Sequence, residues 1–266
     1  MDKAEDPSGE DRRAKPRLYL GADLATGVTV ELESAQAHYL RNVLRLTQGR
    51  HVVLFNGRDG EFQAEIAKLG RNTCALTLGH RLRSQDEPGG PRLFFAPVKR
   101  ARLEFIVEKA TEIGVDLLQP VITRRTIVHR LNADRLRAIA VEAAEQCERI
   151  TLPTLAEPIA LSSLPTAWPP ERHLLVCAER GSAVPIAEAA RNRRGSLALD
   201  VLIGPEGGFD EAELDALAKL SFATLVGLGP RILRADTAAI AALSVVQSLA
   251  GDTRGRPPYR ANGRGE

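Results

Sequence analysis

The sequence predicts an α/β protein in which a small β-rich domain precedes a larger domain built on a mostly parallel sheet. Residues 17–83 form short apolar runs joined by tight turns, and residues 92–251 alternate such runs with amphipathic helical segments. Between them, residues 84–91 (SQDEPGGP) have the polar, proline- and glycine-rich composition of a linker. Alternating strands and helices are typical of a parallel sheet covered on both faces. With 266 residues, the chain is long enough to bury a sizeable core.

The β-rich segment contains a clear hairpin signal. Strands are predicted at residues 50–55 (RHVVLF), 61–66 and 74–78, and the dipeptides Asn56-Gly57 and Asp59-Gly60 separate the first two. Residues 35–46 predict a helical turn or short helix that carries His38, Arg41 and Arg45. Together these elements favour a small β-barrel. The polar residues 1–16 before it are expected to be disordered.

The larger domain begins with an expected strand at residues 93–97 and an amphipathic helix that ends at Gly114. A second strand at 117–123 precedes a helix that Asn132 can cap and that Pro153 limits. Further strands are expected at 174–178, 199–203 and 224–228, with helices at 182–193, 210–220 and 236–250. Residues 252–266, rich in arginine and glycine, are expected to be a disordered tail.

Composition excludes several classes of protein. The formal net charge is only +2, yet basic residues gather in groups that can follow a phosphate backbone. Three cysteines without a CxxC motif, and histidines without ligand spacing, argue against a disulfide framework and a metal site. No apolar run approaches the length of a membrane span, and no early segment resembles a signal peptide. We therefore expect a soluble cytoplasmic protein without metal or membrane contact.

Two loops near the C-terminus are the most informative part of the chain. They are residues 202–210 (LIGPEGGFD) and 227–237 (GLGPRILRADT), and each follows a predicted strand and precedes a predicted helix. Asp210 and Glu213 have the spacing of a capping box, so a helix is expected to begin directly after the first loop. In an open α/β sheet, ligands bind at such strand ends. The alternative is that both loops are tight turns without a ligand.

The residue types in these loops exclude the common phosphate sites. A P-loop needs lysine followed by serine or threonine, and the dinucleotide fingerprint needs a glycine where Ile232 stands. Neither loop offers a serine nucleophile. What remains is glycine backbone with aliphatic side chains, which suits a flat, mostly uncharged group such as adenine. Charge at the edge of this site comes from Arg231, Arg234 and Asp236.

These loops closely resemble the signature loops of the ribosomal RNA small subunit methyltransferase E family, which belongs to the knotted SPOUT methyltransferases. The resemblance extends to residues 108–114 (EKATEIG) with Pro120 and residues 126–128, to residues 142–146 (EAAEQ), and to residues 38–45 (HYLRNVLR). It covers roughly residues 17–250. The joint pattern is specific, although no single piece would be.

The resemblance implies an N-terminal PUA-like RNA-binding β-barrel at residues 17–83 and a SPOUT methyltransferase domain with a trefoil knot at residues 92–251. It implies a homodimer that takes S-adenosylmethionine as methyl donor. The implied substrate is a uridine of 16S rRNA in the small ribosomal subunit, methylated at N3. The residues expected to bind the cofactor are Leu202, Ile203, Gly204, Pro205, Glu206, Gly207, Gly208, Leu228, Gly229, Ile232, Leu233, Arg234 and Thr237.

Roles in the chemistry follow as hypotheses. Arg234, and secondarily Arg231, would stabilise the uridine anion. Asp236 would act as general base or orient Arg234, unless it caps a helix beside Thr237. Glu206 would contact the donor or brace its loop. RNA backbone contacts are expected from Arg41, Arg45, Arg124 and Arg125.

The chain departs from the family pattern in three places. Arg-Ala-Asp-Thr (234–237) replaces Arg-Thr-Glu-Thr, Cys-Glu-Arg (147–149) replaces Ser-Gly-Arg, and Thr-Arg-Arg (123–125) replaces Thr-Glu-Arg. These changes bear on the acid–base partner more than on the reaction. Three other functions remain open: a non-catalytic RNA-binding protein, an ATP- or NAD-dependent enzyme that uses the same loops, and a SPOUT methyltransferase that acts on transfer RNA or the large subunit.

Overall fold

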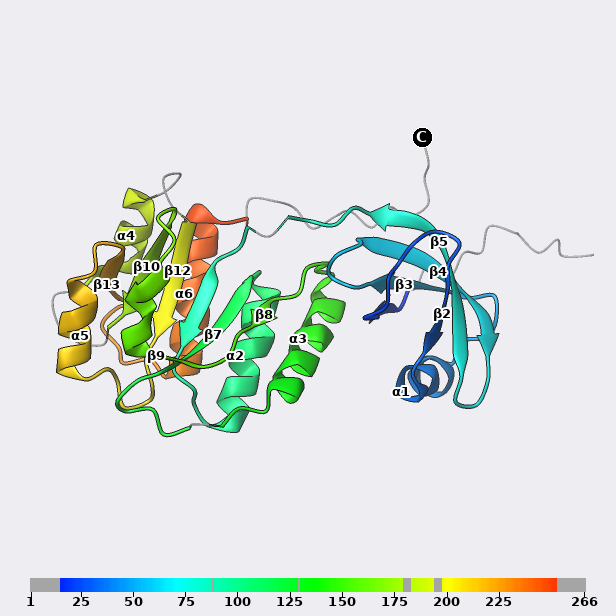
Figure 1. Ribbon diagram of the computed structural model, residues 1–266, viewed down its shortest axis with the longest axis horizontal. Coiled ribbons are helices and arrows are strands. Elements are labelled where there is room, and N and C mark those ends of the chain that lie inside the picture. Colours follow the sequence, from blue (N-terminus) through cyan, green and yellow to red (C-terminus); the bar gives the residue numbers. More distant parts are fainter. Residues whose placement is uncertain (1–14, 88, 129, 179–182, 194–197, 253–266) are drawn as a thin grey trace, which may run out of the picture. The chain divides into compact units, whose positions relative to one another are not determined.

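The computed structural model describes residues 15–87, 89–128, 130–178, 183–193 and 198–252. Within the described residues, the chain divides into two compact units, residues 15–85 and residues 86–252 (Figure 1). The division falls between Gln85 and Asp86, inside the predicted linker. The disordered tails predicted at either end lie, apart from Lys15, Pro16 and Asp252, outside the described residues.

The first unit contains a five-stranded sheet in the order β1-β3-β4-β5-β2. Its strands are β1 (Arg17–Tyr19), β2 (Thr29–Leu32), β3 (His51–Phe55), β4 (Glu61–Leu69) and β5 (Cys74–Arg83). All neighbours are antiparallel except β1 and β3. The predicted hairpin is confirmed, because β3 and β4 pair on either side of the Asn56–Gly60 turn. The Asn56 side chain accepts the N–H groups of Arg58 and Asp59, which fixes this turn.

The helical segment of this unit changes character within one turn. Helix α1 (Ser34–His38) continues into a π-helical turn at Tyr39–Val43. Leu44 N–H donates to the Tyr39 carbonyl, and Leu46 N–H reaches back to Leu40, so the turn is wider than an α-helix. Ala37 and Leu40 are buried in the unit's core, while Tyr39 and Val43 remain exposed. The segment therefore presents both apolar and basic side chains to solvent.

The second unit is an α/β domain with a wholly parallel sheet, in the order β11-β13-β10-β12-β6-β7-β8 with β9 beside β7. The strands are β6 (Arg92–Phe95), β7 (Leu117–Ile122), β8 (Thr154–Leu155), β9 (Ile159–Ala160), β10 (Arg172–Cys177), β11 (Val184–Pro185), β12 (Ala198–Ile203) and β13 (Ala223–Gly227). The helices are α2 (Arg100–Glu112), α3 (Ala133–Cys147), α4 (Ile186–Asn192), α5 (Glu211–Ala218) and α6 (Ala235–Ala250), with a 3-10 helix at Leu161–Ala167. The predicted alternation of strands and helices is confirmed.

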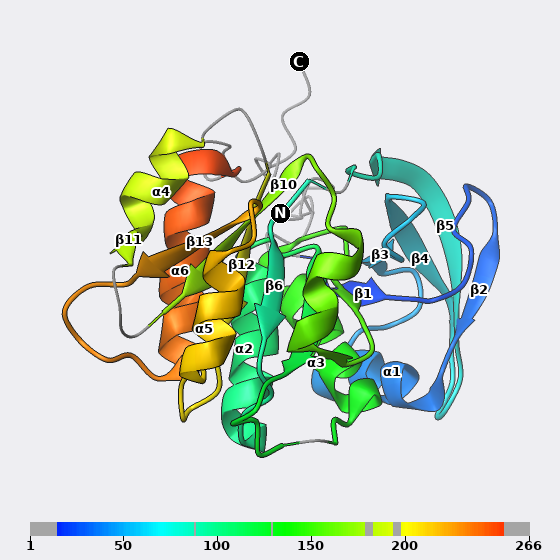
Figure 2. The same ribbon diagram turned by 60° about the vertical axis from the view of Figure 1, so that its left-hand side comes forward.

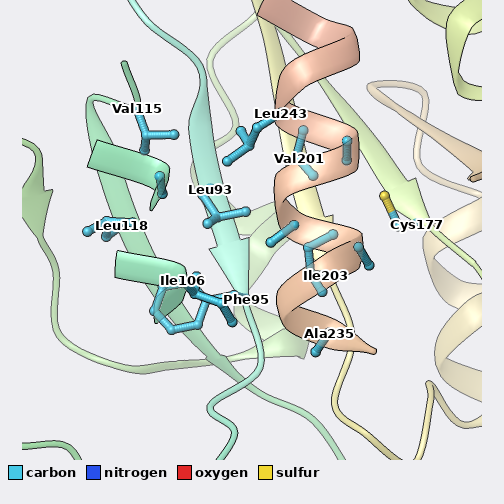
Figure 3. Close-up of a cluster of buried hydrophobic side chains, with 14 of the residues drawn as sticks. Leu93, Phe95, Ile106, Val115, Leu118, Cys177, Val201, Ile203, Ala235 and Leu243 are labelled. Atoms are coloured by element: carbon cyan, nitrogen blue, oxygen red, sulfur yellow. The ribbon is translucent and has the colours of Figure 1, made fainter. Parts of the chain in front are cut away.

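Helices cover both faces of this sheet. On one face α4, α6, α2 and α3 follow one another and share a large core (Figures 1 and 2). Figure 3 shows how Leu93, Val201 and Leu243 from β6, β12 and α6 meet in this core. On the other face α5 and the 3-10 helix pack with Phe94 and Leu202. Successive residues of a strand thus contribute to opposite cores, as the alternation of side chains requires.

A buried ion pair fixes the amino ends of three adjacent strands. Asp200 of β12 is fully buried and accepts hydrogen bonds from the Arg172 guanidinium of β10 and from the backbone N–H of Arg92 in β6. Because the carboxylate is paired and hydrogen-bonded, it is tolerated inside the sheet. The register it fixes carries through to the opposite, carboxyl ends of the same strands.

Candidate active site

The carboxyl ends of β10, β12 and β13 open into a pocket of about 350 Å³. Strand β12 lies between β10 and β6. From β6 the chain continues to β7 on one side, whereas from β12 it continues to β13 on the other side. Such a switch point leaves a crevice at the strand ends, because the connections on its two sides diverge. Both loops singled out in the sequence line the pocket, one after β12 and one between β13 and α6.

The first loop is held in place by its own aromatic residue. A Cβ at Gly204 would lie 2.8 Å from the ring of Phe209, so only glycine fits there. Phe209 is itself buried in the core beneath α5. Gly208 has a φ of 69° and donates to the Pro205 carbonyl over 2.9 Å. The predicted capping box of Asp210 and Glu213 is confirmed at the start of α5.

The second loop exposes its backbone to the pocket. Gly229 has a φ of 104°, and no atom lies within 4 Å of where its Cβ would stand. Ile232 in the same loop is 75% exposed, which is unusual for an isoleucine. Helix α6 follows at once, and Ala235 and Ala238 from its first turn line the pocket. The free N–H groups of this helix end favour an electron-rich ligand atom nearby.

Most of the residues predicted to bind a cofactor lie around this pocket. They are Ile203, Gly204, Pro205, Glu206, Gly208, Leu228, Gly229, Ile232, Leu233 and Arg234, and Arg231 joins them. Three others do not line it. Leu202 points to the opposite face of the sheet from Ile203 and is fully buried there. Gly207 and Thr237 are exposed outside the pocket lining.

Asp236, predicted as base or as orienting group, also lies outside the lining. Its Oδ1 accepts the backbone N–H of Thr237 over 2.9 Å in the first turn of α6. A carboxylate there satisfies a free N–H and interacts favourably with the helix dipole. The N-cap of α6 is Arg234, so Asp236 contacts the first turn without being its cap residue, and its role in the chemistry stays a prediction.

Several pocket residues were not anticipated from the sequence. They are Arg102, Cys177, Ala178, Phe209, Pro230, Ala235 and Ala238. Burial raises the pKa of the Cys177 thiol to about 12, which disfavours the reactive thiolate at neutral pH. Arg102 belongs to the first turn of α2, which follows β6, and Phe95 at the end of β6 pairs with Ile203. The sequence does not show that β6 lies beside β12, and this adjacency is what brings Arg102 to the pocket.

Arg102 forms an ion pair with Glu206 of the first loop, and both side chains line the pocket. The charged residues around the pocket are therefore Arg102, Glu206, Arg231 and Arg234. The rest of the lining is aliphatic side chain, proline, Phe209 and glycine backbone. Such a surface can hold an apolar, flat group and direct a charged group to one edge.

The two arginines predicted to bind RNA in this unit contact the first loop from outside. Arg125 Nη1 donates to the Gly207 carbonyl over 2.9 Å, and Arg124 Nη1 lies 2.8 Å from Asp210 Oδ1. The backbone N–H of Arg124 donates to Glu213, so this turn is attached to the start of α5. Their side chains are still 66% and 52% exposed. Arg41 and Arg45, in the other unit, are exposed.

Within the described ranges, no group of three or more His, Cys, Asp or Glu residues is placed to hold a metal ion. In the same part of the chain, none of the helices is long and apolar enough to span a membrane.

Comparison with known proteins gives consistent matches over both units. A family described as RNA methyltransferase domain matches residues 87–247, and one described as RNA methyltransferase PUA domain matches residues 32–79. The chain is 33% identical to ribosomal RNA small subunit methyltransferase E of Rickettsia conorii, over 88% of this chain and 95% of that protein. It is 32% identical to the Synechocystis protein of the same name, over 88% and 77%.

Solved structures agree with these matches. The structure of ribosomal RNA small subunit methyltransferase E from Neisseria gonorrhoeae, bound to S-adenosyl methionine, has a TM-score of 0.79 at 30% identity and covers 90% of this chain and 100% of that one. A Legionella pneumophila protein in complex with the cofactor SAM has a TM-score of 0.76 at 28% identity, with the same coverage.

Proposed function

The chain belongs to the ribosomal RNA small subunit methyltransferase E family, and we propose that it transfers a methyl group from S-adenosylmethionine to N3 of a uridine in 16S rRNA of the small ribosomal subunit. The observation that carries this proposal is the meeting of the two glycine loops at one pocket of about 350 Å³. That volume lies within the range of small-molecule sites, about 300–1,000 Å³.

The residues around the pocket fit the donor. Glycine backbone at Gly204, Gly208 and Gly229 leaves main-chain groups accessible for hydrogen bonds to an adenine. Leu228 and Leu233 supply apolar surface for its ring. Open space where a Cβ of Gly229 would stand is consistent with a ligand that passes close to the backbone. When bound, S-adenosylmethionine supplies an electrophilic methyl group on a sulfonium.

The protein's own contribution is to hold two reactants in line and to stabilise the ionised base. Orientation alone can supply up to about 7–11 kcal/mol. Uridine N3 carries a proton at neutral pH, so the nucleophile forms only when that proton passes to solvent water. We assign stabilisation of the resulting anion to Arg234, with Arg231 second, because both arginines line the pocket. Asp236 we assign to the start of α6, since its carboxylate accepts the Thr237 N–H.

Binding of RNA is proposed to involve both units. In the PUA-like unit, Arg41 and Arg45 are exposed, and so is Tyr39 at 42%, whose ring can stack on a base. Arg124 and Arg125 keep much of their guanidinium surface free for phosphate while they hold the first loop. The target base must leave its stack to reach the pocket. A homodimer, a trefoil knot and a cytoplasmic location remain proposals that follow from the family.

A direct test incubates the protein with methyl-labelled donor and small subunits from a strain that lacks this activity. The modified nucleotide is then mapped by primer extension, because a methyl group on N3 blocks base pairing. Label in small-subunit RNA at one uridine is the expected result. Label only in transfer RNA or large subunits would favour another RNA target, and RNA binding without donor binding would favour a non-catalytic protein. Melting shifts with ATP or NAD, but not with the donor, would favour a nucleotide-dependent enzyme.

A pair of glycine variants tests the pocket itself. Gly229→Leu places a side chain at the pocket lining, whereas Gly27→Leu places the same side chain at a positive φ and in open space in the other unit. Both carry a similar backbone penalty, on the order of 1–2 kcal/mol. Only Gly229→Leu is expected to abolish donor binding. Equal donor affinity in the two variants would contradict the assignment of the pocket.

A further inference from the structure

One charged side chain at the pocket comes from outside the two loops. Arg102 stands in the first turn of α2, 104 positions along the chain from Glu206, and the two form an ion pair. Among the described residues that line the pocket, Glu206 is the only one with a carboxylate. The pair therefore brings one positive and one negative group together at the same edge of the site.

The side chains of this pair are partly shielded from solvent. The side chains of Arg102 and Glu206 are 31% and 27% exposed, whereas Arg100 in the same helical turn is 82% exposed in its pair with Glu104. Partly shielded charges interact more strongly with a ligand than fully hydrated ones do. The proposed function assigns stabilisation of the uridine anion to Arg234 and Arg231, so it leaves Arg102 and Glu206 at the pocket without a role.

We propose that Arg102 and Glu206 recognise the amino-acid end of the methyl donor, with Arg102 pairing with its α-carboxylate and Glu206 with its α-ammonium group. This inference rests on the proposed function, since it concerns the same donor. The donor's two end charges match the two side chains in sign and number. Binding would exchange one internal ion pair for two pairs with the ligand, and the guanidinium geometry suits a carboxylate.

A purely structural role makes a different prediction. If the pair only braced the first loop against α2, its loss would weaken every ligand of the pocket to the same extent. If it recognises the amino-acid end, its loss weakens only ligands that carry that end. Ligand truncation therefore separates the two roles without any measurement of methyl transfer.

The test uses calorimetric titration of the full chain, without RNA, with three ligands. S-adenosylhomocysteine carries both end charges, its decarboxylated analogue keeps only the amine, and methylthioadenosine has neither. The variants are Arg102→Gln and Glu206→Gln, with Arg100→Gln as matched control, because Arg100 does not line the pocket. The wild-type protein is expected to bind all three ligands.

Removal of one charged partner is expected to weaken binding about ten- to hundred-fold. Arg102→Gln should bind S-adenosylhomocysteine more weakly by this factor but should bind the decarboxylated analogue as the wild type does. Glu206→Gln should bind both ligands more weakly by this factor. Neither variant should change the affinity for methylthioadenosine, which also verifies that the pocket is folded, and Arg100→Gln should change nothing.

Two patterns would overturn the inference while leaving the proposed function intact. One is a uniform loss for all three ligands, which would make the pair a brace. The other is unchanged affinity for S-adenosylhomocysteine in both variants. A wild-type protein that binds none of the three ligands would instead contradict the proposed function, and the inference with it.

Discussion

Acidification should destabilise this protein through one buried histidine. His173 lies in β10 with 1% of its surface exposed, and its Nε2 shares a hydrogen bond of 2.9 Å with Oγ1 of Thr224 in β13. Burial, and secondarily the positive charge of Arg193, lowers the pKa of His173 from 6.5 to about 4. The imidazole therefore stays neutral in the folded protein at a pH where it is protonated in the unfolded chain.

The sign and size of the effect follow from this difference. Below about pH 6.5 the unfolded chain takes up a proton that the folded chain does not, so stability is lost as the pH falls toward about 4. A group with these two pKa values costs about 2 kcal/mol of unfolding free energy at about pH 5, relative to neutral pH. The loss approaches on the order of 3 kcal/mol near the lower pKa.

The assay is urea unfolding of the wild-type protein and of His173→Gln at several pH values. Glutamine can keep a hydrogen bond to Thr224 but does not titrate, and all other titrating groups are shared by the two proteins. Between neutral pH and about pH 5, the wild-type protein should therefore lose about 2 kcal/mol more unfolding free energy than the variant does. A difference that stays constant over this range would refute the reasoning.

Three further predictions concern the site. Arg234→Ala should reduce methyl transfer about 100- to 1,000-fold while donor affinity is retained, because its guanidinium is proposed to act on the ionised base; unchanged turnover would remove it from the chemistry. Arg125→Ala removes the hydrogen bond to the Gly207 carbonyl and should weaken donor binding several-fold even without RNA, whereas Arg130→Ala, also exposed, should not; equal donor affinity in both would limit Arg125 to RNA contact. RNA affinity should fall steeply with salt, and Arg41→Ala should lower the slope by about one; a salt-independent constant would exclude contact with the RNA backbone.

Local sequence patterns were sufficient to predict several turns and helix starts. The Asn56-Gly57 hairpin, the Asn132 cap and the Asp210–Glu213 capping box all depend on residues within a few positions of one another. The two glycine loops could be located for the same reason. Their ligand class could be narrowed because the loops lack lysine and a third glycine.

Contacts between distant segments were beyond the reach of these patterns. Arg102 reaches the pocket only because β6 lies beside β12, and Arg125 reaches Gly207 across 82 positions of the chain. The face of the sheet to which each strand residue points also decides which predicted residues line the pocket. Ile203 lines it, whereas Leu202 is buried on the other side of the sheet. Periodicity shows that side chains alternate, but it does not show which face carries the ligand.

The sequence by itself determined the two-part organisation, the parallel α/β class and the loops that form the pocket, because short-range periodicity and turn chemistry specify each of these. Only the tertiary structure decided which charged groups surround the pocket and that Asp236 lies outside its lining, with its carboxylate on the backbone N–H of Thr237. The physical reason is that the order of strands in a sheet sets which loop ends meet, and that order is a property of the packed chain as a whole.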